Sequence, residues 1–215
     1  MTETELKKYA GVIVKRLAKH YPDSVTHLDH KNPFELLIST VLAAQMTDEG
    51  VNKTMTPLYK TKYKKPQDIL KDGFENFRNN IKSINFYNNK AKAVISLCED
   101  LVNNYGGKVP DTMDELIKLK GVGRKTANVV LGNCFGKTDV IIVDTHLKRV
   151  SQRLGLVDSD KPEVIEKELS ELITAKDQFN FSMRIGDHGR QICKAKKPLC
   201  EECFLNDICP SAFKV

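Results

Sequence analysis

The segment that decides the fold lies in the middle of the chain and reads Leu116-Ile117-Lys118-Leu119-Lys120-Gly121-Val122-Gly123-Arg124-Lys125-Thr126-Ala127. Its two glycines form a tight turn between a short predicted helix and a longer one over Arg124–Phe135. Glycine permits backbone angles that are closed to other residues, so the amides that begin the second helix can converge on a phosphate. The pattern predicts a helix-hairpin-helix that contacts phosphates through Gly121, Gly123 and Arg124 without reading base sequence.

Lys125 directly follows this turn, and a carboxylate lies 19 residues further on, at Asp144. The hairpin alone also fits an ordinary helix-helix turn with Lys125 on a solvated face. Asp144 comes after the apolar run Val140–Val143 and begins another predicted helix. It therefore either caps that helix or, if the run packs back across the hairpin, faces Lys125.

Helical periodicity dominates the rest of the chain. Further helices are predicted behind a Thr2–Glu5 capping box, over Phe34–Ala44 after Asn32 and Pro33, behind Thr47 and Asp48, from Pro66, from Asp111 or Thr112, and over Phe86–Tyr105, Thr145–Leu154, Pro162–Ile173 and Phe179–Ile192. The only strand-like run, Val140–Val143, has no sheet to join and is predicted to be a buried extended connector. We expect an all-α fold.

Composition limits the class of protein. The chain has 215 residues, and its 34 Lys and Arg against 28 Asp and Glu leave a formal charge of +6. That excess favours polyanion partners through electrostatic steering and counterion release. No stretch approaches the roughly 18 to 20 apolar residues of a membrane helix, and the N-terminus lacks a signal-peptide core. We expect a soluble intracellular protein with no membrane partner.

Four of the six cysteines crowd together near the C-terminus as Cys193, Cys200, Cys203 and Cys209, with the spacing Cys-x6-Cys-x2-Cys-x5-Cys. Four thiolates this close predict one metal centre in a reducing compartment, rather than a disulfide scaffold. Zinc sites usually present two tight pairs, and only one is present here, so a [4Fe-4S] cluster is favoured and zinc is the alternative. Cys98 and Cys134 are predicted to be small buried hydrophobic residues.

A basic loop lies between the first two of these cysteines and contains Lys194, Lys196 and Lys197. Wrapping a metal centre would also freeze this loop in a shape that can meet phosphates. The alternative is a solvated charged loop, because lysine runs are common on protein surfaces. On the first interpretation, the metal centre has a structural use rather than a redox one.

Five motifs in a fixed order extend over nearly the whole chain. They are Leu42-Ala43-Ala44-Gln45-Met46-Thr47-Asp48 with Val51-Asn52-Lys53, Tyr87-Asn88-Asn89-Lys90-Ala91, the glycine hairpin continued to Val130, Val143-Asp144-Thr145-His146, and His188-Gly189-Arg190 before the cysteines. Together they resemble the endonuclease III family, the helix-hairpin-helix DNA glycosylases with a C-terminal iron-sulfur loop. Lys120 departs from the family pattern, which usually has proline there, and Ala44 and Met46 vary the loop around Gln45.

The resemblance implies an architecture and a partner. Residues 28–137 would form a six-helix barrel domain with the helix-hairpin-helix, residues 1–27 and 138–215 would form the iron-sulfur domain, and double-stranded DNA would lie in a cleft between the two. A monomer would rotate the target nucleotide out of the duplex. Gln45 matches the family residue that fills the vacated space.

The resemblance also implies a chemistry: a bifunctional DNA glycosylase and abasic-site lyase that removes damaged, mainly oxidised, pyrimidines. Lys125 would attack the sugar as the nucleophile and Asp144 would be its carboxylate partner. Lys125 must be neutral to attack, and burial at the positive end of its helix should favour the neutral amine. One alternative is a monofunctional glycosylase for thymine or uracil opposite guanine, or adenine opposite oxidised guanine, with Lys125 a bystander. A non-catalytic DNA-binding module of a repair assembly is the other.

Overall fold

The structure is a computed structural model that describes residues 1–215, and its regular structure is entirely helical. The helices are α1 (Glu3–His20), α2 (Pro33–Leu42), α3 (Asp48–Thr61), α4 (Pro66–Asp72), α5 (Phe74–Asn80), α6 (Tyr87–Tyr105), α7 (Met113–Leu116), α8 (Arg124–Phe135), α9 (Thr145–Arg153), α10 (Pro162–Leu172), α11 (Ala175–Gln191) and the single 3-10 turn η1 (Cys200–Glu202). The all-α prediction is confirmed. The run at 140–143 forms no strand, as predicted.

Polar caps set several helix starts where the sequence placed them. The Thr2 side chain accepts a hydrogen bond from the Glu5 amide, and the Glu5 carboxylate accepts one from the Thr2 amide, which completes the predicted capping box of α1. The side chains of Asn32 and Thr47 cap α2 and α3 by accepting hydrogen bonds from the amides of Glu35 and Gly50, without the reciprocal bond.

The sequence analysis did not predict two helical segments, α5 and the first turn of α11. The sequence pattern did not indicate α5, because its only fully buried side chain is Phe77 and a single buried position shows no periodicity. The predicted start of α11 at Phe179 is wrong, since the helix begins four residues earlier. Its first turn buries Gln178, whose side-chain amide donates to the carbonyls of Ser170 and Ile173. A buried polar residue that bonds to backbone leaves no apolar signal in the sequence.

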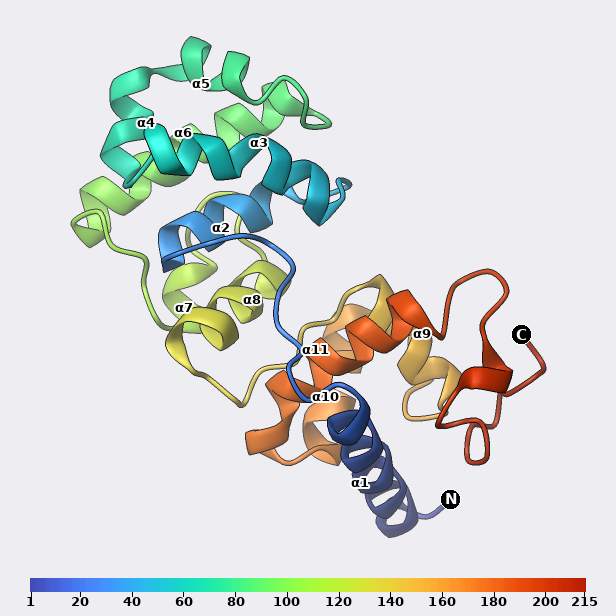
Figure 1. Cartoon of the computed structure of the whole chain (residues 1–215). Helices are drawn as coiled ribbons and strands as arrows, with labels where there is room; N and C mark the ends of the chain where they lie inside the picture. Colours follow the sequence, from blue (N-terminus) through green and yellow to red (C-terminus); the bar gives the residue numbers. More distant parts are fainter. The chain divides into compact units, whose positions relative to one another are not determined.

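The chain divides into two compact units, residues 26–136 and residues 1–25 joined to 137–215. The first unit holds α2 to α8 and is organised around α2, which contacts α3, α6 and α8 (Figure 1). Eight of the ten residues of α2 are buried, which is expected for a helix surrounded by other helices. The helices α4 and α5 pack against α6.

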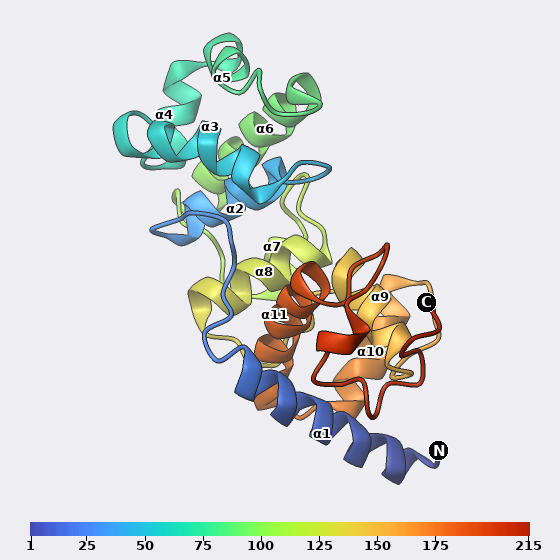
Figure 2. The same cartoon turned by 45° about the vertical axis from the view of Figure 1, so that its right-hand side comes forward.

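The second unit joins the two ends of the chain. The N-terminal helix α1 packs against α10 and α11, and α11 packs against α9, so segments far apart in sequence lie side by side (Figures 1 and 2). The C-terminal segment after α11 contains η1 and no further α-helix. No helix in the structure has both the length and the apolar character that a membrane span requires.

Candidate iron-sulfur and DNA-contacting sites

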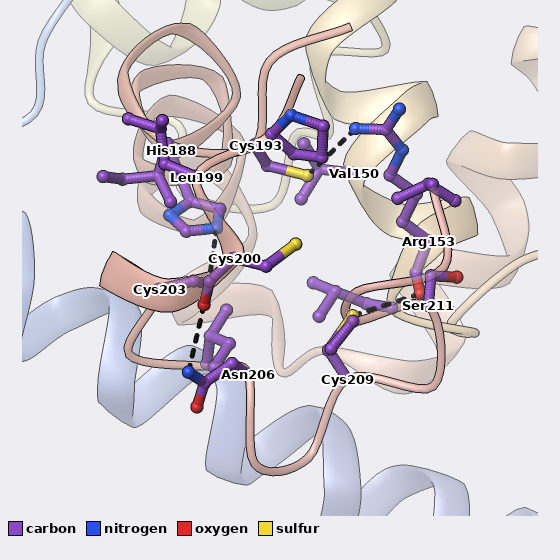
Figure 3. Close-up of a pocket in the computed structure, with 16 residues that line it drawn as sticks. Val150, Arg153, His188, Cys193, Leu199, Cys200, Cys203, Asn206, Cys209 and Ser211 are labelled. Carbon is purple, nitrogen blue, oxygen red and sulfur yellow. Dashed lines mark hydrogen bonds between the residues drawn. The ribbon is translucent and has the colours of Figure 1, made fainter. Parts of the chain in front are cut away.

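The four clustered cysteines line a single pocket in the unit formed by 1–25 and 137–215 (Figure 3). Cys193 follows the end of α11, Cys200 begins η1, and Cys203 and Cys209 lie in the segment beyond it. The rest of the pocket wall is largely apolar and includes Val150, Leu154, Ile192, Leu199 and Leu205. An apolar pocket lined by four sulfurs is a suitable environment for an iron-sulfur cluster.

Polar groups around this pocket suit ligand sulfurs. The Arg153 Nη1 lies 3.5 Å from the Cys193 Sγ, and the His188 Nε2 lies 3.6 Å from the Cys203 Sγ. Burial is the main cause that raises the pKa of Cys203, and the three neighbouring thiols raise it further. The pKa of His188 falls to about 4, mainly because the ring is buried. The pocket therefore fits the predicted cofactor, and these four cysteines would hold it.

The basic loop is held at its base and exposed at its lysines. Arg153 donates to the carbonyls of Lys194 and Ala195 at 2.7 and 3.1 Å, and Arg149 donates to the Cys193 carbonyl at 2.9 Å. The side chains of Lys194, Lys196 and Lys197 are all exposed. The arginines of α9 thus set the backbone shape of the loop, while the ammonium groups of its lysines stay available to an anion. Their contact with DNA stays a prediction.

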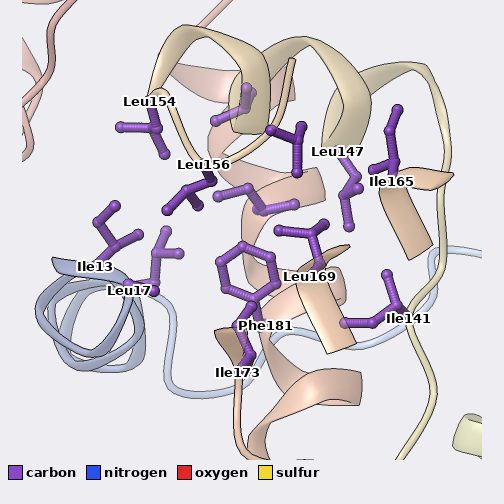
Figure 4. Close-up of a cluster of buried hydrophobic side chains, with 14 of the residues drawn as sticks. Ile13, Leu17, Ile141, Leu147, Leu154, Leu156, Ile165, Leu169, Ile173 and Phe181 are labelled. Carbon is purple, nitrogen blue, oxygen red and sulfur yellow. The ribbon is translucent and has the colours of Figure 1, made fainter. Parts of the chain in front are cut away.

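Asp144 is the N-cap of α9, and its Oδ1 accepts a hydrogen bond from the Leu147 amide at 2.7 Å. Asp144 therefore caps the helix, and capping through one oxygen does not exclude a catalytic role for the other. Figure 4 shows how α9 is anchored: Leu147 points into a buried apolar cluster that also contains Ile13 of α1 and Phe181 of α11. The cap fixes the half-buried carboxylate on a rigid helix, and the bond occupies only one of its two oxygens.

The hairpin glycines have different local requirements. Gly121 has a φ of +82°, in the left-handed region that favours glycine, whereas Gly123 is extended at φ −95° and caps α8. A Cβ on Gly123 would meet nothing within 4 Å. Glycine at 123 thus leaves open space in front of the α8 amides, as phosphate contact would require. At Lys120, where the family pattern has proline, the backbone amide donates to the Asp100 Oδ2 at 3.4 Å.

Lys125 lies in the first turn of α8 with an exposed side chain, as does Arg124. The expected burial of Lys125 is wrong, because its side chain on the first turn of α8 is exposed. Lys125 belongs to the unit 26–136 and Asp144 to the other unit. The structure brings the four cysteines together, while the pairing of Lys125 with Asp144 stays a prediction.

Gln45 is exposed in the turn after α2 and has a left-handed backbone, with φ +54°. Its carbonyl, and those of Leu42 and Ala44, accept hydrogen bonds from the side chains of Asn85 and Lys90. Sequence reasoning missed this role for Asn85 and Lys90, although Lys90 lies inside a motif that it singled out. Among the remaining cysteines, Cys98 is fully buried as predicted, and Cys134 is half-buried.

Comparison with known proteins agrees with these sites. Residues 38–175 match the HhH-GPD superfamily base excision DNA repair protein, and residues 193–209 match the iron-sulfur binding domain of endonuclease III. The endonuclease III of Synechocystis sp. is 45% identical over 206 residues, which cover 96% of this chain and 94% of that protein. The chain belongs to the endonuclease III family. The predicted [4Fe-4S] cofactor is thereby confirmed.

Two solved structures extend the comparison. An endonuclease III–DNA covalent intermediate, trapped as an estranged-adenine complex, is 42% identical, has a TM-score of 0.90, and matches over 96% of both chains. A thermostable thymine-DNA glycosylase is 27% identical, with a TM-score of 0.85 over 97% of this chain and 98% of that one. The endonuclease III fold is therefore shared over nearly the whole chain.

Proposed function

We propose that this protein is a bifunctional DNA glycosylase and abasic-site lyase that removes damaged, mainly oxidised, pyrimidines from double-stranded DNA. The observation that carries the proposal is the close match to an endonuclease III trapped in a covalent complex with DNA. A covalent intermediate requires a nucleophile, and Lys125 follows the hairpin in the motif that carries the family resemblance. Exposed on the first turn of α8, this amine is accessible to a bound strand.

Each proposed catalytic group has one task. Breaking the bond between base and deoxyribose builds positive charge on the sugar, which an ionised Asp144 stabilises. The Lys125 amine forms a bond to the sugar C1′ as the base leaves with the electrons of its bond, and the nitrogen loses a proton. The C1′–O4′ bond then breaks, O4′ takes up a proton, and C1′ and the nitrogen form the Schiff base. Removal of a C2′ proton then expels the 3′ phosphate and breaks the strand. Lys125 is exposed, and we infer that a bound strand covers its side chain and excludes water from the reacting atoms.

The remaining predicted residues bind DNA. At the start of α8, the DNA backbone would be contacted by Gly121, Gly123 and Arg124. From the basic loop it would be contacted by Lys194, Lys196 and Lys197. Gln45 would fill the space left by the extruded nucleotide. The iron-sulfur cluster, when bound, crosslinks the segments that frame this loop. We assign the six-helix barrel to the unit 26–136 and the iron-sulfur domain to the other unit. As its substrate is chromosomal DNA, we place the protein, acting as a monomer, in the cytoplasm and nucleoid or in the nucleus.

The similarity to a thymine-DNA glycosylase favours one second candidate, a monofunctional mismatch glycosylase in which Lys125 does not attack. A labelled duplex with a single thymine glycol, compared with a thymine–guanine mismatch and an undamaged duplex, separates the candidates. We expect base release and strand breakage without alkali on the thymine glycol substrate. Breakage only after alkali would indicate the monofunctional enzyme, and salt-dependent binding without any product would indicate a binding module.

A further inference from the structure

The turn that carries Gln45 is held by one side chain from α6, Lys90, and by one from the segment just before α6, Asn85. The Lys90 Nζ donates to the Leu42 carbonyl at 2.9 Å and to the Ala44 carbonyl at 2.7 Å. The Asn85 Nδ2 donates to the carbonyl of Gln45 itself at 2.9 Å. Three of the four carbonyls between residues 42 and 45 are thus bound from one other segment of the chain.

Lys90 is an unusual choice for this contact, because its side chain is only 8% exposed. Burying an ammonium group is costly unless it is hydrogen-bonded, and here burial lowers the pKa of Lys90. The two carbonyls offset that cost, and they lie where the end of α2 leaves its last carbonyls without intrahelical partners. If this position only needed a side chain to fill buried space, a neutral side chain would be sufficient. The buried ammonium group, which donates to both carbonyls, therefore holds the shape of the turn in addition to filling space.

Backbone strain lies on both sides of the same contact. Gln45 has φ +54°, and Phe86, next to the Asn85 donor, has φ +58°. Left-handed backbone is unfavourable for a residue with a side chain, and it persists only where surrounding contacts impose it. The result is that the Gln45 side chain is presented to solvent on a turn whose carbonyls are bound by Asn85 and by Lys90 of α6.

We propose that Lys90 and Asn85 are positioning residues, which hold Gln45 in its left-handed, outward-facing conformation before DNA binds. This inference rests on the proposed function, since it assigns the benefit to filling the gap left by an extruded nucleotide. A pre-ordered turn avoids the entropy cost of ordering Gln45 at the moment of binding. The pre-ordered turn should therefore increase affinity for DNA that has an abasic or extruded position. It should not change affinity for undamaged duplex.

The first test measures the turn in the holoprotein without DNA. The Met46 amide donates to the Ala43 carbonyl at 3.0 Å, so its hydrogen exchange reports the closed turn. We expect Asn85→Ala and Lys90→Met to accelerate this exchange several-fold. The controls are Asn88→Ala and Lys92→Met, which replace exposed residues of α6. They should leave the exchange rate of the Met46 amide unchanged. Asn85 is exposed, so its variant tests the proposal even if Lys90→Met fails to fold.

The second test measures affinity for a duplex containing a tetrahydrofuran abasic analogue. Asn85→Ala and Lys90→Met should each weaken binding by about threefold to tenfold and leave affinity for intact duplex unchanged. The same substitutions in a Gln45→Ala background should cause no further loss, because both residues act through Gln45. Full additivity with Gln45→Ala would overturn the proposal in favour of a purely structural contact.

The two tests separate failure of this inference from failure of the proposed function. Unchanged exchange of the Met46 amide in both variants overturns the positioning role, whatever Gln45 does on DNA. If exchange accelerates but Gln45→Ala binds the analogue as tightly as the parent protein, the positioning role stands. In that case the proposed contact of Gln45 with the vacated space is the part that fails.

Discussion

The Nε2 of His188 lies 3.6 Å from the Sγ of Cys203, and the Nδ1 of the same ring lies 3.3 Å from the hydroxyl of Tyr21. A ligand thiolate only accepts hydrogen bonds, so Nε2 carries the ring proton and Tyr21 donates to Nδ1. Hydrogen bonds to ligand sulfurs are one of the factors that set the reduction potential of a cluster. When Cys203 holds the cluster as a thiolate, Tyr21 and His188 would therefore form a donor chain that ends on that ligand sulfur.

Replacing His188 by leucine should lower the reduction potential of the bound cluster, because the lost hydrogen bond stabilises the more negatively charged, reduced state. His20→Leu is a matched control, since His20 stacks on Phe204 with ring centroids 3.8 Å apart and forms no hydrogen bond to a thiol. A redox titration of the holoproteins, with iron content measured in parallel, gives the comparison. An unchanged potential in His188→Leu with full iron would rule out this role.

Asp144 can be tested for catalysis separately from capping. Asparagine is a good N-cap, so Asp144→Asn should keep α9 intact, whereas Asp144→Ala should destabilise the protein by about 1 kcal/mol. Both variants should lose base-release activity by roughly 10²-fold or more, because neither carries the negative charge. Thermal unfolding and single-turnover base release provide the two measurements. Full activity in Asp144→Asn would reduce Asp144 to a capping residue.

The two hairpin glycines should respond differently to alanine. Gly121→Ala forces a Cβ into left-handed backbone and should cost about 1 to 2 kcal/mol of unfolding free energy. Gly123→Ala meets no neighbouring atom and should cost less than about 1 kcal/mol, mainly through a weaker N-cap. It should nevertheless weaken DNA binding, because the methyl group occupies the open space before the α8 amides. Equal DNA affinity in Gly123→Ala and the parent would contradict phosphate contact there.

The loop lysines should contribute to DNA affinity in a way that depends on salt concentration. Each neutralised phosphate contact contributes about 0.9 to the slope of log affinity against log salt concentration. Replacing Lys194, Lys196 and Lys197 together by glutamine should therefore reduce that slope by up to about 3. Lys8→Gln, an exposed lysine on α1, is the control and should leave the slope unchanged. An unaltered slope in the triple variant would identify the loop as a solvated surface.

Sequence patterns predicted the parts of the fold that depend on neighbouring residues. Thr2 and Asn32 cap helices whose apolar stripes are local signals, and the spacing of Cys193 to Cys209 specifies one centre without knowledge of the fold. The segment α5 was missed because a short helix with one buried side chain lacks periodicity. Local rules thus identify long amphipathic helices and compact ligand sets.

Contacts between distant segments were beyond such rules. Lys90 bonds to carbonyls 46 and 48 positions away, and its burial cannot be inferred from a lysine in a polar motif. Lys125 shows the opposite error, because its proposed chemistry suggested burial but its side chain on the first turn of α8 is exposed. Both properties depend on tertiary packing, which single-sequence patterns do not encode.

The most direct measurement concerns the amine that attacks DNA. The holoprotein is incubated with a thymine glycol duplex and sodium borohydride, and the trapped adduct is mapped by peptide mass spectrometry. Lys125→Gln serves as the control and should fold normally, because the replaced side chain is exposed. We predict a covalent protein–DNA adduct on Lys125 that is absent from Lys125→Gln. An adduct on another residue, or base release with no adduct at all, would contradict the proposed mechanism.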